Sequence, residues 1–241
     1  HFYSIFDYNK ALEYYNKSLE IYNKLMNKDG ISRTVGNIGN IYMDKYDYDR
    51  ALEFYNKSLK MKEKLGDNYS IPFALVSIGN ILNLKGEYIQ ALEKYKNSAI
   101  LSKRFNISLA STPLGRMGII YYNMGDYKNA KKYLEESIKA SKENKSNESQ
   151  IYSIIYLFLI YKNFGKDYNV DKIYKFIKEA KEIKFEISYQ LFNLLEDTSY
   201  LETAYNQIQE KASAMEDELA TKFLSYPIPK AIVEEWEKVN N

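Results

Sequence analysis

The sequence predicts an all-α chain built from antiparallel helix pairs. Three observations support this class. Sequence markers return about every 40 residues, apolar side chains within each unit are spaced three and four residues apart, and a helical glycine is followed twelve residues later by an alanine. The repetition indicates one structural unit that is copied along the chain.

An acidic residue followed by tyrosine marks each copy of the unit. The pairs are Asp7-Tyr8, Asp47-Tyr48, Glu87-Tyr88 and Asp126-Tyr127, with a weaker copy at Asp167-Tyr168. An alanine follows each of the first four pairs, at Ala11, Ala51, Ala91 and Ala130, and a serine stands seven residues further on, at Ser18, Ser58, Ser98 and Ser137.

Each unit is predicted to contain two helices. The first carries Val35, Ile38 and Tyr42 on one face and ends near residues 45–46. Asp47 can cap the second helix, and Gly66 suits the left-handed position after it. Pro72 and Pro113 fall near the starts of first helices, where proline is tolerated.

The recurring glycines predict a close contact within each helix pair. Glycine inside a helix costs roughly 0.5–1 kcal/mol relative to alanine. We expect Gly39 to offset this cost by letting the first helix press, backbone to backbone, on the second helix at Ala51. Gly79 with Ala91 and Gly118 with Ala130 predict the same contact twice more.

This ordered set resembles the tetratricopeptide repeat, over roughly residues 1–145 clearly and 146–183 poorly. The residues that carry the resemblance are Ile38-Gly39, Tyr42, Ala51, Tyr55 and Ser58. The unit exceeds the common 34 residues and looks like the repeats of kinesin light chains and Pins-like G-protein-signalling modulators. The resemblance implies a right-handed α-solenoid, or superhelix, whose first helices line a concave groove.

The expected domain organisation is a repeat array at 1–184 followed by a helical cap or dimerisation segment at 185–241. Within the array we expect a partial repeat at 1–30, clear repeats at 31–70, 71–108 and 109–147, and a divergent repeat at 148–184. The chain begins partway through a repeat, so we expect it to be part of a longer protein.

The pattern changes after residue 150. Phe158 occupies the glycine position, so a divergent helix pair is expected there. Residues 186–224 lack glycine and proline and predict a long helix or helix pair. Its coiled-coil-like seam comprises Leu194, Thr198, Leu201, Tyr205, Ile208, Ala212, Met215 and Leu219. The seam either covers the end of the solenoid or forms a homodimer. A terminal helix at 231–239 places Trp236 on this segment as a cap.

The composition provides no catalytic or metal-binding set. The chain has no cysteine, one histidine at position 1, and a net charge of +2. The "GNIGN" string lacks the Gly-Lys-Ser/Thr ending of a phosphate loop. The most apolar stretch, 151–160, is too short to cross a bilayer. We therefore expect no enzyme activity, cofactor, metal, nucleic-acid or membrane partner, and a cytoplasmic protein.

The family resemblance places a peptide-binding groove on the first helices. The candidate groove residues are Asn37, Asn40, Met43, Asp44, Phe73, Ser77, Asn80, Asn83, Leu84, Arg116, Tyr122 and Asn123. Asn40 and Asn80 are equivalent, and an amide can both donate to and accept from a peptide backbone. Ile119 replaces them in the third repeat, so this ladder has at most two rungs. A solvated asparagine without a ligand is the alternative.

Three functions are compatible with these features. The first is a protein-interaction scaffold that binds a peptide or partner helix in the groove. The second is the sensor or regulatory segment of a larger signalling protein, which dimerises or transmits a signal through 186–224. The third is a passive structural spacer.

Overall fold

The computed structural model describes residues 8–107, 109, 111–144, 147–180 and 183–240, and these residues form thirteen α-helices and no strand. The all-α class predicted from the sequence is confirmed. The chain divides into two compact units, His1–Ile107 and Ser108–Asn241. The predicted domain boundary after residue 184 stays a prediction.

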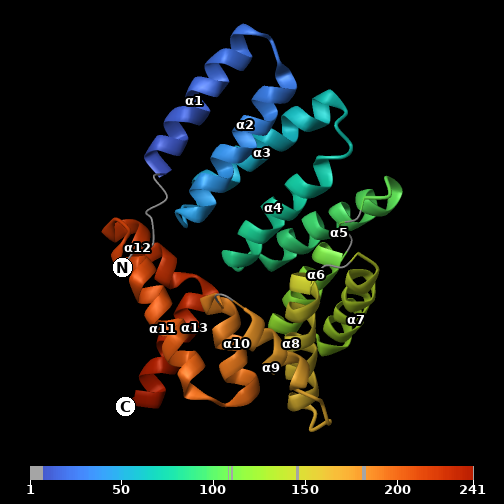
Figure 1. Cartoon of the computed structure of the whole chain (residues 1–241), viewed down its shortest axis with the longest axis vertical. Helices are drawn as coiled ribbons and strands as arrows, with labels where there is room; N and C mark the ends of the chain where they lie inside the picture. The colour runs from blue at the N-terminus through green and yellow to red at the C-terminus, as the bar shows by residue number, and fades with distance from the viewer. Residues whose placement is uncertain (1–7, 108, 110, 145–146, 181–182, 241) are drawn as a thin grey trace. The chain divides into compact units, whose positions relative to one another are not determined.

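The first unit consists of one helix followed by two helix pairs. Its helices are α1 (Tyr8–Lys24), α2 (Lys28–Asp44), α3 (Tyr48–Leu65), α4 (Ile71–Leu84) and α5 (Tyr88–Arg104). Helices α2 and α3 form one antiparallel pair and α4 and α5 form the next (Figure 1). α1 packs on α2 and α3 packs on α4, so each second helix is followed by the first helix of the next pair.

The predicted helix ends of this unit are confirmed. The Arg50 backbone N–H donates to the Asp47 carboxylate over 3.2 Å, which caps α3. Gly66 ends the same helix with a φ of 67°, in the left-handed region. Pro72 lies in the first turn of α4, where its missing N–H costs nothing.

The second unit begins with a pair of the same kind and then departs from the pattern. Its helices are α6 (Ser111–Asn123), α7 (Tyr127–Asn144), α8 (Asn147–Asn163), α9 (Asp171–Glu179), α10 (Phe185–Leu195), α11 (Thr198–Ser213), α12 (Asp217–Ser225) and α13 (Pro227–Asn240). α8 packs on α6, α7 and α10. Contact on three sides explains why Ile155, Leu159 and Ile160 are all buried in one helix.

The glycines permit close packing, but the atoms they contact differ from the prediction. A Cβ atom added to Gly39 would lie 2.8 Å from the Tyr55 ring, and one added to Gly79 would lie 2.8 Å from the Tyr95 ring. Side chains of the second helix, rather than Ala51 and its backbone, are therefore the nearest neighbours. The reason is that the tyrosine four residues beyond the alanine, one helical turn on, lays its ring over the glycine.

The third pair comes closest to the predicted backbone contact. A Cβ on Gly118 would lie 2.7 Å from Leu134 Cγ and 3.0 Å from the Leu134 backbone nitrogen. The alanines at 51, 91 and 130 are nonetheless completely buried between the paired helices.

The repeated serine of the second helix forms a hydrogen bond to the start of the first helix in each pair. Its hydroxyl donates to a carbonyl near the start of the first helix, from Ser58 to Ser32, Ser98 to Pro72 and Ser137 to Ser111, over 2.7, 2.9 and 2.8 Å. These hydroxyls are buried, so each bond also satisfies a polar group that water cannot reach.

The segment after residue 150 departs from the pattern of the earlier pairs, and its assignment as a divergent repeat stays a prediction. With Phe158 at the glycine position, α8 makes little contact with α9, which is only 9 residues long. The Phe158 ring packs instead on Tyr161 and Tyr168, at centroid distances of 6.3 and 5.3 Å. A bulky side chain at this position therefore replaces the tight helix pair with aromatic packing.

The segment 186–224, predicted to be one long helix or a helix pair, contains α10, α11 and most of α12 instead. Glu196 adopts a left-handed conformation with a φ of 60°, and Asp197 then caps α11 by accepting from the Ser199 N–H over 3.0 Å. A second break precedes α12 at Glu216, whose backbone is extended. A capping aspartate and a left-handed glutamate thus end a helix without glycine or proline.

The predicted seam is divided among these helices. Leu194, Leu201, Ile208 and Ala212 are buried within this single chain, whereas Thr198 is exposed. The terminal helix starts at Pro227, four residues earlier than predicted. Trp236 stacks on Tyr205 of α11, with ring centroids 4.8 Å apart, as the capping prediction required.

No helix within the described residues is both long and apolar enough to cross a membrane.

We predict that Gly79→Ala destabilises the chain, although alanine is the better helix former. The new Cβ would overlap the fully buried Tyr95 ring, and overpacking a core costs about 1–3 kcal/mol. Urea unfolding followed by circular dichroism measures the change. Asn97→Ala, on the exposed side of α5, is the control and should leave the midpoint nearly unchanged. A higher midpoint for Gly79→Ala would contradict the proposed contact.

Candidate peptide-binding face

All predicted groove residues lie on three first helices, α2 and α4 in the first unit and α6 in the second. The structure brings three of the α2 residues together around one side chain of the paired helix, Tyr55. Its hydroxyl donates to Asn40 Oδ1 over 2.7 Å and also lies 3.5 Å from the Met43 sulfur. Burial, and then the charge of Asp44, raises the pKa of Tyr55. The hydroxyl therefore keeps its proton and remains a donor.

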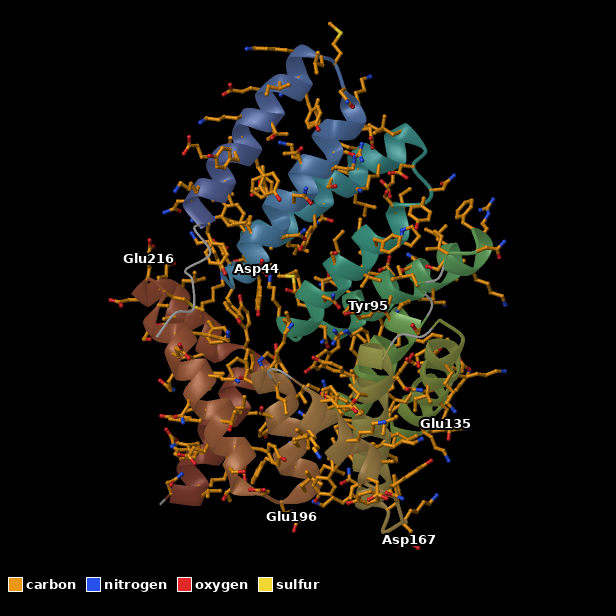
Figure 2. All side chains as sticks on the ribbon, viewed as in Figure 1. Asp44, Tyr95, Glu135, Asp167, Glu196 and Glu216 are labelled. Carbon is orange, nitrogen blue, oxygen red and sulfur yellow. The ribbon has the colours of Figure 1, made fainter. Side chains whose placement is uncertain are left out.

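The equivalent bond is repeated on α4. The Tyr95 hydroxyl donates to Asn80 Oδ1 over 2.7 Å, and its ring is fully buried between α4 and α5 (Figure 2). Within the described residues, neither Asn40 nor Asn80 has a hydrogen-bond partner for its amide nitrogen. The tyrosines thus turn both amide oxygens toward the second helices and leave both NH₂ groups available.

The third pair replaces this polar contact by an apolar one. Ile119 stands where Asn40 and Asn80 stand, and Leu134 stands where Tyr55 and Tyr95 stand. Both Ile119 and Leu134 are buried. The two positions change together because a tyrosine hydroxyl facing isoleucine would be buried without a partner.

The remaining predicted residues of the first unit do not gather around one shared side chain. Asn37 and Asp44 are exposed, and Phe73 is 40% exposed with its ring 5.6 Å from that of Tyr69. The Ser77 hydroxyl donates to the Phe73 carbonyl of its own helix over 3.2 Å. Leu84 is half-buried, and Asn83 Oδ1 is buried with no hydrogen-bond partner in the described part of the chain.

Two of the three predicted residues of the second unit, Arg116 and Tyr122, contact α8. The Arg116 guanidinium lies 5.3 Å from the centre of the Tyr152 ring. Tyr122 packs edge-on against Tyr156, with centroids 5.2 Å apart. Asn123 is exposed. Arg116 and Tyr122 therefore serve the packing of α6 on α8 and are less available to a ligand than the α2 and α4 amides.

Two residues near Arg116 were missed from the sequence. Tyr156 lies one 40-residue step beyond Arg116, so extending the period by one unit would have found it. Glu186 carried no such signal. Its Oε2 is buried with no hydrogen-bond partner among the residues that the structure describes, and burial raises its pKa against the opposing charges of Lys184, Arg116 and Lys211.

Among the residues that the structure describes, no group of three or more histidine, cysteine, aspartate or glutamate side chains could hold a metal ion.

The chain contains tetratricopeptide repeats. Family models described as tetratricopeptide repeat match residues 3–68 and 112–144. A comparison with curated protein sequences gives no match.

Solved structures of the same fold are similar over most of the chain. The apo form of RapI has a TM-score of 0.69 at 17% identity, covering 97% of this chain and 94% of that one. A Rap protein complexed with Competence and Sporulation Factor has a TM-score of 0.60 at 19% identity, covering 96% and 60%. BtubC (BKLC) from P. vanneervenii has a TM-score of 0.57 at 14% identity, covering 91% of each chain. This chain thus spans 60% of the complexed Rap protein.

We predict an energetic coupling between Asn80 and Tyr95. Asn80→Ala removes the acceptor of this buried hydroxyl and should cost about 1–3 kcal/mol, whereas the coupling in a double-mutant cycle with Tyr95→Phe should be about 0.5–1.5 kcal/mol. Urea unfolding of the four proteins measures both values. Asn123→Ala, at an exposed position of α6, should have little effect. Strict additivity of the two changes would rule out the hydrogen bond.

We further predict that Glu186 makes stability fall as the pH rises. Its pKa is raised in the folded chain, so the folded state keeps the proton above the ordinary glutamate value of about 4.3. The free energy of unfolding should then decrease from that pH through the raised pKa. Glu186→Gln has no carboxyl group to ionise. The variant's free energy of unfolding, measured relative to the parent at the same pH, should therefore be higher at pH 7 than at pH 4. Glu202→Gln, at an exposed site on α11, should show no such difference.

Proposed function

We propose that the chain is a protein-interaction scaffold that binds a peptide or partner helix on the first-helix face. The tetratricopeptide repeats support an interaction role in general. One structural neighbour, a Rap protein, is complexed with Competence and Sporulation Factor, so a similar fold holds a bound factor. The finer assignment to a peptide rests on the side chains of α2 and α4.

The observation that carries the proposal is the pair of oriented amides. Asn40 and Asn80 occupy equivalent positions on consecutive first helices, and each is held through its oxygen by a buried tyrosine. Each amide is therefore already fixed in orientation before a ligand binds. Binding then costs less side-chain entropy. The amide oxygen keeps one free lone pair after it accepts from the tyrosine. Each asparagine is therefore mainly a hydrogen-bond donor to a ligand and can accept one further hydrogen bond.

The preferred ligand chemistry follows from this orientation. Peptide backbone carbonyls are acceptors that recur along a segment, and donors fixed at repeated positions match them regardless of side chains. The partly exposed ring of Phe73 adds an apolar contact on α4. We infer that the amides set the ligand's position while apolar side chains such as Phe73, Met43 and Leu84 supply most of the affinity.

A regulatory segment of a larger signalling protein is the second candidate. It is suggested by the neighbouring Rap protein that is complexed with Competence and Sporulation Factor, of whose length this chain spans 60%. The dimerising form of this candidate is weakened, because Leu194, Leu201 and Ile208 of the proposed seam are already buried within one chain. The form of this second candidate in which 186–224 transmits a signal without dimerising is not affected by this burial.

The test uses the chain's own apolar pair as a template. In the variant, Asn40 and Asn80 become isoleucine and Tyr55 and Tyr95 become leucine, which copies Ile119 and Leu134. Peptides selected on the parent from a random-sequence array should bind the variant about tenfold more weakly, since two hydrogen bonds of roughly 0.5–1.5 kcal/mol are lost. Fluorescence anisotropy measures the affinities.

Circular dichroism should show that the variant keeps its helicity and melting temperature. Asn97→Ala, on the outer side of α5, should bind as tightly as the parent. Equal binding by the four-residue variant would exclude the amide ladder. If the array yields no peptide that binds the parent, the passive spacer is favoured instead.

A further inference from the structure

The two paired second helices of the first unit end in the same kind of residue pair, one basic and one apolar. α3 ends in Lys64-Leu65, and Arg104-Phe105 stands at the equivalent place at the end of α5. Lys24-Leu25 repeats the pair at the end of α1. α3 and α5 end on the same side of the first unit (Figure 1). We refer to Lys64, Leu65, Arg104 and Phe105 as the basic edge.

The backbone presents the two pairs of the basic edge in the same way. A residue in the left-handed region follows each pair, with a φ of 67° at Gly66 and 52° at Asn106. The next backbone N–H then donates to a carbonyl five residues earlier, over 3.0 Å after α3 and 2.8 Å after α5. This pattern is the Schellman motif, which closes a helix with a defined turn. The basic edge is therefore a repeated structural feature.

The apolar residues of the basic edge are exposed to solvent. Leu65 is 40% exposed and Phe105 is 37% exposed, and Tyr69 in the turn after Leu65 is 67% exposed. Lys64 and Arg104 are exposed beside them, and neither forms an ion pair with a residue that the structure describes. The edge therefore combines apolar contact area with cationic groups.

The turns at the opposite end of the same helix pairs are built differently. There Lys85 pairs with Asp49 and Glu87, with a distance of 3.0 Å to each carboxylate. The Tyr46 ring packs on that of Tyr48, with centroids 6.2 Å apart. The basic and aromatic side chains of those turns therefore have partners within the first unit, whereas Lys64 and Arg104 have no acidic partner in the described part of the chain.

The charge around the basic edge is mainly of one sign. Residues 57–65 and the equivalent residues 97–105 contain six basic residues and one acidic residue, Glu63, although the net charge of the whole chain is only +2. No acidic residue stands between Glu93 and Asp126. The helix dipole favours cations in a last turn, but it explains neither Lys57 and Lys60 nor the exposed apolar residues. The complementary surface is one that carries both carboxylates and apolar groups.

We propose that the basic edge binds an acidic protein segment that also carries apolar side chains. Carboxylates of the segment pair with Lys64 and Arg104, and its apolar side chains pack on Leu65 and Phe105. These two side chains are only partly exposed, so they offer little area to insert into a bilayer, whereas a flexible segment can pack on both.

This site is distinct from the amide pair of the first helices. Asn40 and Asn80 lie toward the C-terminal ends of α2 and α4, and the antiparallel second helices have their C-terminal ends at the other end of each pair. The proposed edge interaction therefore does not depend on peptide binding at the amides.

The test probes the full chain with synthetic peptides that contain glutamate and leucine in varied order. Matched peptides carry lysine in place of every glutamate. Fluorescence anisotropy at low and at raised salt measures the affinities. We expect the glutamate peptides to bind and the lysine peptides not to bind, and we expect raised salt to weaken binding because it screens the charges.

Two variants locate the binding on the basic edge. Lys64→Gln with Arg104→Gln should weaken binding of the glutamate peptides about fivefold. Leu65→Ser with Phe105→Ser should weaken it about tenfold, because the apolar anchors are lost. All four side chains are exposed, so circular dichroism should show unchanged helicity.

The matched control is Lys128→Gln with Lys166→Gln. Both lysines are exposed in the second unit, and their replacement removes the same charge from the chain. This control should bind the glutamate peptides as tightly as the parent. The variant that changes Asn40, Asn80, Tyr55 and Tyr95 should also keep this binding.

Four results would overturn the proposal. The first is equal binding of glutamate and lysine peptides, or no binding of either. The second is binding by both edge variants that is as tight as that of the parent. The third is loss of binding when the amides of α2 and α4 are replaced. The fourth is retention of the parent, but not of the edge variants, on vesicles of equal parts phosphatidylserine and phosphatidylcholine while no glutamate peptide binds, because the ligand would then be a membrane.

Discussion

The close approach of a glycine to a side chain of the paired helix is the contact on which the repeats depend. At Gly39 and Gly79 there is no room for a Cβ, because a tyrosine ring fills the space. The helical cost of glycine is offset by burial of that ring and of the adjacent alanine. The serine hydroxyl bonds at the far end then fix how far one helix can slide along the other.

The same tyrosines connect packing to the candidate binding face. Their rings pack against Gly39 and Gly79. Their hydroxyls donate to the Asn40 and Asn80 side-chain oxygens and so fix the orientation of both amides. Stability and the proposed ligand recognition are therefore linked at these positions, since a change to either asparagine also removes the oxygen that accepts from a buried tyrosine hydroxyl. In the third helix pair, Ile119 and Leu134 are both buried at the equivalent positions. Apolar side chains can therefore keep the two helices packed there, but this pair has no asparagine amide.

The second unit shows what happens when the glycine is absent. With Phe158 in its place, α8 barely contacts α9 and packs on α6, α7 and α10 instead. The aromatic side chains around Arg116 then belong to helix packing. Glu186 is buried near Arg116, its Oε2 has no hydrogen-bond partner in the described part of the chain, and burial raises its pKa.

The sequence alone determined the helix pairs, their length, the caps at Asp47 and Gly66, and the existence of a close contact at each glycine. These features repeat and join residues near one another in the chain, so a period and local helix chemistry suffice to predict them. Only the tertiary structure decided that Tyr55 and Tyr95, rather than the alanines, face the glycines and hold the asparagine amides. It also decided the break at Glu196 and the burial of Glu186. Those outcomes depend on how side chains from different helices share space, which no single segment of sequence encodes.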